Sequence, residues 1–270
     1  KRGSIRKARH DEICHAIMQS TGCIFHPDIS RENERYNRMK CSRRFYGLEV
    51  ETECSFSHDP GSILDQSPLD DSLWYAKHDG SIGSQECAGY ELVSHPFSWE
   101  YLQENQESMI TIPFRYLRSR GFRSHNSGRC GMHIHVSKYS VSRMQVWRSL
   151  LFFHSHEDFV LQVSQRERQQ LDCYARIEKN KRNMMYMAKN RCASDSRYTA
   201  INLCPSATVE FRIFRGNIRP ERILKNIEFI HSLLAFTLDV AYNNSDIRYY
   251  LDYIHSRSKE YSNLHSFLNE

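Results

Sequence analysis

Strict alternation of apolar and polar residues in segment 131–137 constrains the fold more than any other feature of this sequence. In an extended chain Ile134 points to one side, whereas His133, His135 and Ser137 point to the other. Two imidazoles two residues apart on one strand face can both reach one site, and imidazole is a common metal ligand. Because His-x-His is short and common, an ordinary strand with a solvated polar face is the alternative.

Two further segments, 45–53 and 208–215, alternate in the same way. Their charged residues each gather on one strand face: Glu49, Glu51 and Glu53 in the first, Glu210 and Arg212 in the second. If the three strands share a sheet, one face is apolar and packs on helices, and the other carries carboxylates, imidazoles and a guanidinium. Plain solvation does not require this mixture. A site for a divalent cation and a phosphate does, because carboxylates bind Mg²⁺ and Arg binds phosphate bidentately.

The remaining segments predict a mixture of strands and helices. A strand at 90–94 places Glu91 where it can face the same side as the other carboxylates. Pro113 is expected to break or kink a helix, and segment 54–73 has the composition of a loop. Further strands are predicted at 74–82 and 197–203, and helices at 98–120, 141–164, 165–190 and 220–241.

Composition and charge exclude several classes of protein. Of the 270 residues 40% are hydrophobic and 26% charged, the balance of a globular chain with a sizeable core. The net charge of +5 suits an anionic substrate or a nucleic acid without deciding between them. Nine scattered cysteines do not resemble a secreted disulfide framework, and no apolar run approaches a membrane span. We therefore expect a cytoplasmic protein with no membrane partner.

Three regions are expected along the chain: a basic extension at 1–43, a main domain at 44–242 and a helical tail at 243–270 that packs on it. The extension carries thiols and imidazoles that together offer a zinc site: Cys14, His15, Cys23, His26 and Cys41. No pair has Cys-x-x-Cys spacing, so a helical or irregular lead-in with incidental thiols is the alternative.

Several short motifs, in this order, resemble those of the amidoligase family, within the glutamine-synthetase-like carboxylate–amine ligase superfamily. The matching segments are 47–51, 79–81, 90–94, 130–137, 197–202 and 208–212. Each motif is short, whereas their order and combination are more specific. The resemblance implies an α+β fold: a curved, mainly antiparallel sheet with helices packed on one face, forming a glutamine-synthetase-like catalytic domain.

The resemblance also implies roles for individual residues. The metal ligands would be Glu49, Glu51, Glu91, His133 and Glu210, holding Mg²⁺ or Mn²⁺. The residues close to the chemistry would be Arg212, beside the transferred phosphoryl group, Glu210 and Asp79. The residues on the ATP side would be Arg197, Arg215, His135 and Ser137. For Asp79 a substrate contact and a metal contact both stay open, and its Asp-Gly pair is also a good turn.

The activity implied is ATP-dependent formation of an amide bond from a carboxylate and an amine through an acyl phosphate. Glutamyl, amino-acid and peptide substrates are all compatible, and the oligomeric state is open. Two alternatives remain. One is a metal-dependent hydrolase built on His133 and His135. The other is a non-catalytic nucleotide- or nucleic-acid-binding protein that uses the basic run 176–191, with nucleic acid the less favoured partner.

Overall fold

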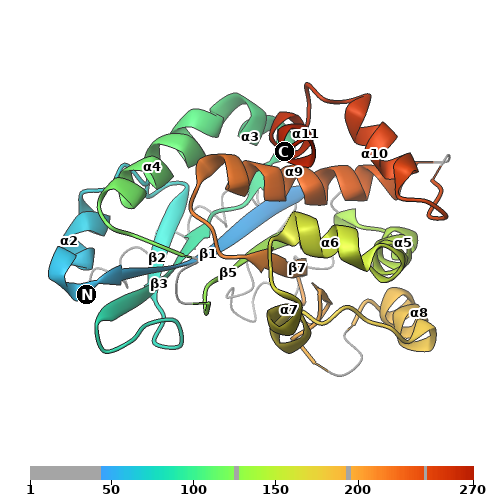
Figure 1. The fold of residues 1–270 in the computed structure, drawn as a ribbon, viewed down its shortest axis with the longest axis horizontal. Helices are drawn as coiled ribbons and strands as arrows, with labels where there is room; N and C mark the ends of the chain where they lie inside the picture. Colours follow the sequence, from blue (N-terminus) through green and yellow to red (C-terminus); the bar gives the residue numbers. More distant parts are fainter. Residues whose placement is uncertain (1–43, 125–127, 193–195, 240–241) are drawn as a thin grey trace. The chain divides into compact units, whose positions relative to one another are not determined.

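The computed structural model describes residues 44–124, 128–192, 196–239 and 242–270, and it has the expected α+β fold with an open, seven-stranded sheet (Figure 1). The strand order is β2-β3-β1-β5-β7-β6, and β4 pairs with β1. The strands are β1 (Phe45–Ser55), β2 (Trp74–His78), β3 (Cys87–Ser94), β4 (Phe97–Ser98), β5 (Gly131–Ser137), β6 (Ile201–Asn202) and β7 (Thr208–Arg215). The ladders of β1 with β3, β4 and β5, of β2 with β3 and of β6 with β7 are antiparallel. The zinc prediction for 1–43 lies outside the described residues.

The chain forms two compact units. The first contains the described part of 1–140 together with 206–208 and 215–220, and the second contains 141–205, 209–214 and 221–270. Strand β7 therefore gives its two ends to the first unit and its middle to the second. The first unit holds the helices η2 (Phe56–His58), α2 (Pro60–Asp65), α3 (Trp99–Gln106), η3 (Glu107–Thr111), α4 (Ile112–Ser119) and η4 (Lys138–Ser140). The second holds α5 (Arg143–Ser155), α6 (Glu157–Ser164), α7 (Arg168–Tyr174), α8 (Lys181–Asn190), most of α9 (Pro220–Phe236), α10 (Arg248–His255) and α11 (Ser262–Leu268).

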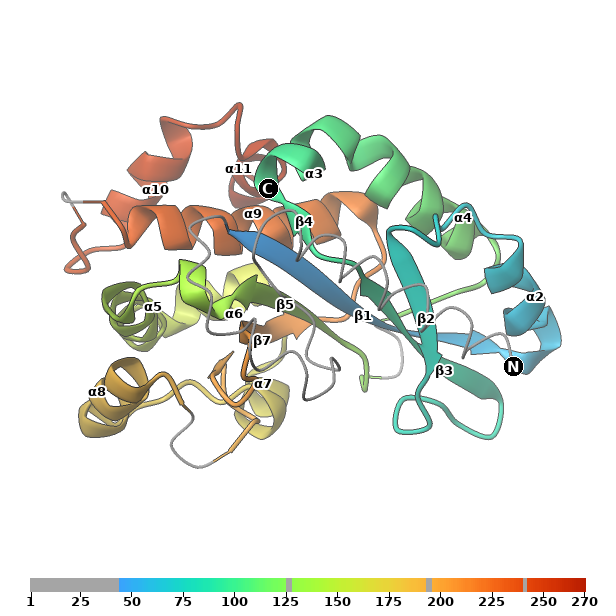
Figure 2. The ribbon, with the colours of Figure 1, turned by 180° about the vertical axis from the view of Figure 1, so that it is seen from behind.

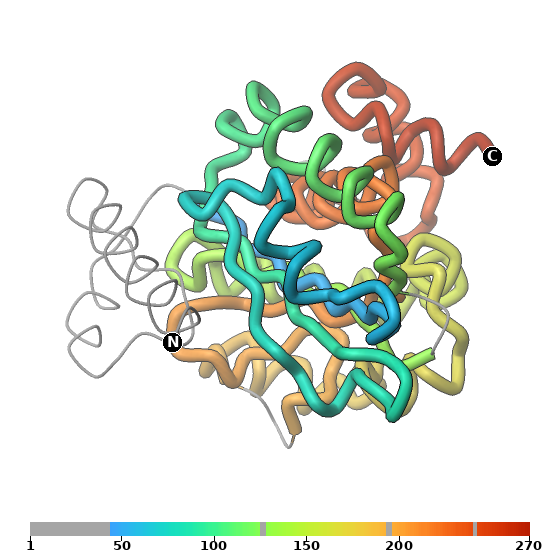
Figure 3. The backbone as a smooth tube through the Cα atoms, turned by 90° about the vertical axis from the view of Figure 1, so that its left-hand side faces the viewer, coloured from blue at the N-terminus to red at the C-terminus, as the bar shows by residue number. Residues whose placement is uncertain are grey.

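In the first unit, α3, η3 and α4 cover the apolar face of the strands (Figures 2 and 3). Leu48 and Val50 of β1 point to that face and are fully buried. Trp74 of β2 packs edge-on against Phe114 of α4 at 5.2 Å between ring centroids. Its indole N–H donates to the carbonyl of Met109 at 3.0 Å, so the largest buried side chain also has its polar atom satisfied. The alternation of β1 thus gives one face to the core and leaves the other for polar side chains.

In the second unit, aromatic side chains of three helices form the core. Phe152 of α5, Phe229 of α9 and Tyr250 of α10 are all buried. The rings of Phe152 and Tyr250 lie 5.0 Å apart, and those of Phe229 and Tyr250 lie 6.0 Å apart. The Tyr250 hydroxyl is hydrogen-bonded to Ser232 at 2.6 Å, which removes the cost of burying it.

Several predicted segments are interrupted. Pro113 lies in the first turn of α4, after a π-helical turn, so the expected helix at 98–120 continues through it in pieces. The predicted helix at 141–164 is broken at His156, whose backbone is not helical. The expected loop at 54–73 contains η2 and α2. Among the described residues, no helix is both long and apolar enough to cross a membrane.

Candidate functional site

The sheet register gathers acidic and imidazole side chains on the polar face of the first unit. Glu49 of β1 is paired with His133 of β5, and Glu51 is paired with Glu91 of β3. Directly paired residues point to the same face of an antiparallel sheet, and so do residues two apart on one strand. Glu49, Glu51, Glu91, His133 and His135 therefore share one face, as predicted; below we call them the acid–imidazole cluster.

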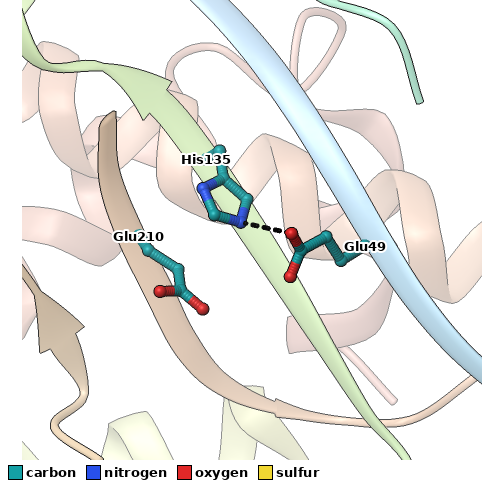
Figure 4. A group of neighbouring side chains, drawn as sticks. All are labelled: Glu49, His135 and Glu210. Atoms are coloured by element: carbon teal, nitrogen blue, oxygen red, sulfur yellow. Dashed lines mark ion pairs between the residues drawn. The ribbon is translucent and has the colours of Figure 1, made fainter. Parts of the chain in front are cut away.

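Glu49 is the centre of this cluster. Its Oε2 lies 3.2 Å from Nδ1 of His133, and its Oε1 lies 3.2 Å from Nε2 of His135. Figure 4 shows the contact with His135 as a dashed line and also draws Glu210 of β7. The Glu49 side chain is only 14% exposed and each imidazole 6%. Both oxygens of one nearly buried carboxylate are thus matched by ring nitrogens.

The pKa values of two carboxyl groups in the cluster, Glu49 and Glu91, are shifted in opposite directions. Burial alone would raise the pKa of Glu49, but the charge of His135 and the hydrogen bonds of both imidazoles hold it well below its usual range. Burial raises the pKa of Glu91 to about 7, the Glu49 carboxylate adds to this, and Lys77, 3.8 Å away, opposes it. Of these two carboxyl groups, Glu49 is therefore the more readily ionised.

Backbone and hydroxyl groups hold the outer members in place. Glu51 Oε2 accepts a short hydrogen bond of 2.5 Å from the backbone N–H of Gly131, the first residue of β5. Nδ1 of His135 lies 3.0 Å from Oγ1 of Thr208, which leaves Nε2 directed at Glu49. These contacts fix the side-chain orientations before any ligand binds.

A second polar cluster is centred on Glu210 in the second unit. Glu210 is 4% exposed; its Oε2 accepts from Nδ2 of Asn202 at 2.6 Å, and its Oε1 pairs with Nη1 of Arg212. Nε of Arg212 is buried without a hydrogen-bond partner in the part of the chain that the structure describes. The pairing of Arg212 with Glu210 through Nη1 therefore leaves the Nε–H of the guanidinium for another acceptor.

Tyr198 joins Arg197 to the Glu210 cluster. Nη2 of Arg197 donates to the Tyr198 hydroxyl at 2.9 Å, and the Arg212 guanidinium lies 5.9 Å from the Tyr198 ring centroid. The hydrogen bond and charge of Arg197 lower the pKa of Tyr198. Sequence reasoning did not assign a role to Tyr198 or Asn202. The β6–β7 register, which pairs Asn202 with Glu210, is the signal that identifies Asn202.

Three other predicted site residues have different partners. Oδ1 of Asp79 accepts from the backbone N–H and the hydroxyl of Ser81, so Asp79 shapes the turn after β2. Ser137 is buried; its hydroxyl accepts from the N–H of Phe45 and donates to Ser140. Arg215 is exposed at the end of β7. Their functional roles remain predictions.

The turn after β2 packs closely against the backbone of Gly89 in β3. The Asp79 N–H donates to the Gly89 carbonyl at 2.9 Å. A Cβ added to Gly89 would lie 2.6 Å from the backbone nitrogen of Gly83, closer than real Cβ atoms approach. Glycine is therefore required where β3 meets the turn after β2.

The protein thus has an α+β fold whose strands carry carboxylates, imidazoles and arginines. A family model described as "Putative amidoligase enzyme" matches residues 30–234. The match covers more than half of the chain, and the protein belongs to this family. No curated protein matches the chain.

Proposed function

We propose that the protein is an ATP-dependent carboxylate–amine ligase that forms an amide bond through an acyl phosphate. Family membership supports a ligase. The observation that carries the proposal is Glu49, a nearly buried carboxylate held between two imidazoles on a face with two further carboxylates. A carboxylate is a poor electrophile, and phosphorylation by ATP supplies the leaving group that an attacking amine requires.

The donor set of this face fits a divalent cation. Glu49, Glu51 and Glu91 supply the hard oxygen ligands that Mg²⁺ and Mn²⁺ prefer, and His133 supplies an imidazole nitrogen as a further ligand. His135 of the same unit also offers a ligand atom close to that of Glu49. A bound cation would neutralise the charge of ATP phosphates during phosphoryl transfer.

Arg212 is the proposed anion-stabilising residue. Its pairing with Glu210 and its position beside the Tyr198 ring restrict the guanidinium, and its Nε lacks a partner among the described residues. A preorganised donor of this kind stabilises charge that develops in the transition state and contributes on the order of a few kcal/mol. We propose that Arg212 donates to the transferred phosphoryl group.

Release of ADP from Mg-ATP tests the proposal. The protein is incubated with pooled amino acids, short peptides and amines, beside Glu49→Gln and the control Glu104→Gln, which changes an exposed carboxylate of α3. We expect pool-dependent ADP release that Glu49→Gln abolishes and Glu104→Gln retains.

Two results would contradict the ligase proposal. One is the absence of both ADP release and any melting shift with Mg-ATP. The other is hydrolysis of pooled peptides without nucleotide, which would favour the hydrolase built on His133 and His135.

A further inference from the structure

A cavity with four arginines among its eight lining residues lies at the C-terminal end of α4 in the first unit. Its volume is about 480 Å³, and the arginines that line it are Arg115, Arg118, Arg123 and Arg219. Small-molecule sites typically measure roughly 300–1,000 Å³. The cavity is therefore large enough for a small organic ligand rather than a single ion; below we call it the arginine cavity.

The arginine cavity is separate from the acid–imidazole cluster. Phe122 lines it, and the Phe122 ring lies 6.1 Å from that of Tyr90. Tyr90 is paired with Thr52, whose side chain is fully buried on the apolar face of β1. The neighbouring Glu51 points to the opposite face. Phe122, and with it this part of the cavity wall, thus lies on the helix-covered side of the strands.

The charged side chains that line the cavity are all positive. No aspartate or glutamate contributes to its wall. Within the described ranges, no carboxylate forms an ion pair with Arg115, Arg118 or Arg219. Like charges that converge on one concave surface raise the local concentration of counter-ions. An anion with more than one negative charge is the complementary ligand.

Local structure orients these arginines. Nη1 of Arg123 donates to the carbonyls of Arg118 and Phe122 at 2.9 and 2.7 Å, which anchors the guanidinium through one nitrogen. Arg115 and Arg118 are three residues apart on α4 and so lie on the same side of the helix. Oδ1 of Asn217 accepts from the backbone N–H of Arg219 at 2.8 Å and fixes the local turn. The wall is therefore partly preorganised.

We propose that the arginine cavity binds a small organic phosphate. The planar guanidinium fork matches two phosphate oxygens, and a phosphate group carries close to two negative charges at neutral pH. Phe122 and Ile218, both buried residues of the wall, supply apolar contacts for the organic part. The proposal concerns the opposite side of the strands from the proposed metal site, and it does not depend on the ligase reaction.

Calorimetric titration of the full chain in EDTA and 150 mM NaCl tests this site, with ribose 5-phosphate as the probe. The double variant Arg118→Gln/Arg219→Gln removes two cavity charges. The matched control Arg120→Gln/Arg257→Gln removes two charges outside the wall, where each arginine lies over a tyrosine ring. We expect a Kd below about 1 mM, weakened at least tenfold in the cavity variant and less than twofold in the control.

Parallel titrations with ribose, citrate and a single-stranded oligonucleotide distinguish the other ligand classes. Ribose is expected not to bind, and citrate is expected to bind more weakly than ribose 5-phosphate. Equal weakening in the two double variants would overturn the proposal, and so would the absence of ribose 5-phosphate binding. Tighter binding of citrate would show a polycarboxylate site instead, and oligonucleotide binding that the cavity variant abolishes would show a nucleic-acid surface.

Discussion

The acid–imidazole cluster and the arginine cavity lie on opposite sides of the same strands, and they differ in whether their charged side chains have partners of opposite charge. In the cluster, both oxygens of Glu49 already face imidazole nitrogens. In the cavity, four guanidiniums converge without a carboxylate in the wall. A cation that binds the first region must compete with the contacts between Glu49 and the imidazoles, whereas an anion that binds the second meets no carboxylate in the wall. The proposed cation and the proposed anion would therefore meet different electrostatic surroundings in the two regions.

The largest effect is expected from Glu49→Gln, which removes the charge at the centre of the cluster. Because the carboxylate is the proposed metal ligand, Mn²⁺ affinity should fall by about a hundredfold or more, equivalent to roughly 3 kcal/mol. Calorimetric titration with Mn²⁺ measures this, with Glu104→Gln as the control. Unchanged Mn²⁺ affinity would mean that Glu49 only orients the two imidazoles.

Lys225 of α9, in the second unit, is a buried positive charge whose effect on stability can be measured. It is 1% exposed; its ammonium group donates to the carbonyl of Val163 and lies 4.5 Å from the Phe267 ring centroid. Burial lowers the pKa of Lys225 to about 7, and the charge of Arg222 adds to this. The folded protein therefore binds fewer protons than the unfolded chain between pH 7 and the ordinary lysine range, and the stability contributed by this group rises with pH there.

Lys225→Met should consequently stabilise the protein at pH 6, by on the order of 2 kcal/mol, and the gain should shrink as the pH rises above 7. Urea unfolding at pH 6, 7.5 and 9 measures this, with the exposed Lys259→Met as the control. A gain that does not change with pH would show that the ammonium keeps its charge in the folded protein.

The smallest effect is expected from Arg118→Gln/Arg219→Gln on stability without ligand. Removing two converging positive charges relieves repulsion, which should stabilise the protein by a few tenths of a kcal/mol at low salt. Screening should remove the gain at 1 M NaCl. Melting curves at both salt concentrations measure this difference in stability. A loss of stability in the variant would show instead that these arginines stabilise the local structure.

Alternation in the sequence was sufficient to predict the sheet face that carries the acid–imidazole cluster. A period of two assigns Glu49, Glu51 and His133 to one side of their strands. In the fold, the register of β1 with β5 pairs Glu49 directly with His133. The break at His156 could not be predicted, because no proline or glycine marks it. The arginine cavity was missed because α4 and the segment after β7, which are remote in sequence, meet there only in the folded chain.

The interleaving of the two units has a practical consequence for fragment expression. Between Ser140 and Glu221 the chain passes repeatedly from one unit to the other, and the middle of β7 belongs to the second unit while its ends belong to the first. A cut after Ser140 separates the two ends of β7 from the rest of the first unit. It would also remove Thr208, the partner of His135, so the shortened fragment would lose a residue that orients the acid–imidazole cluster.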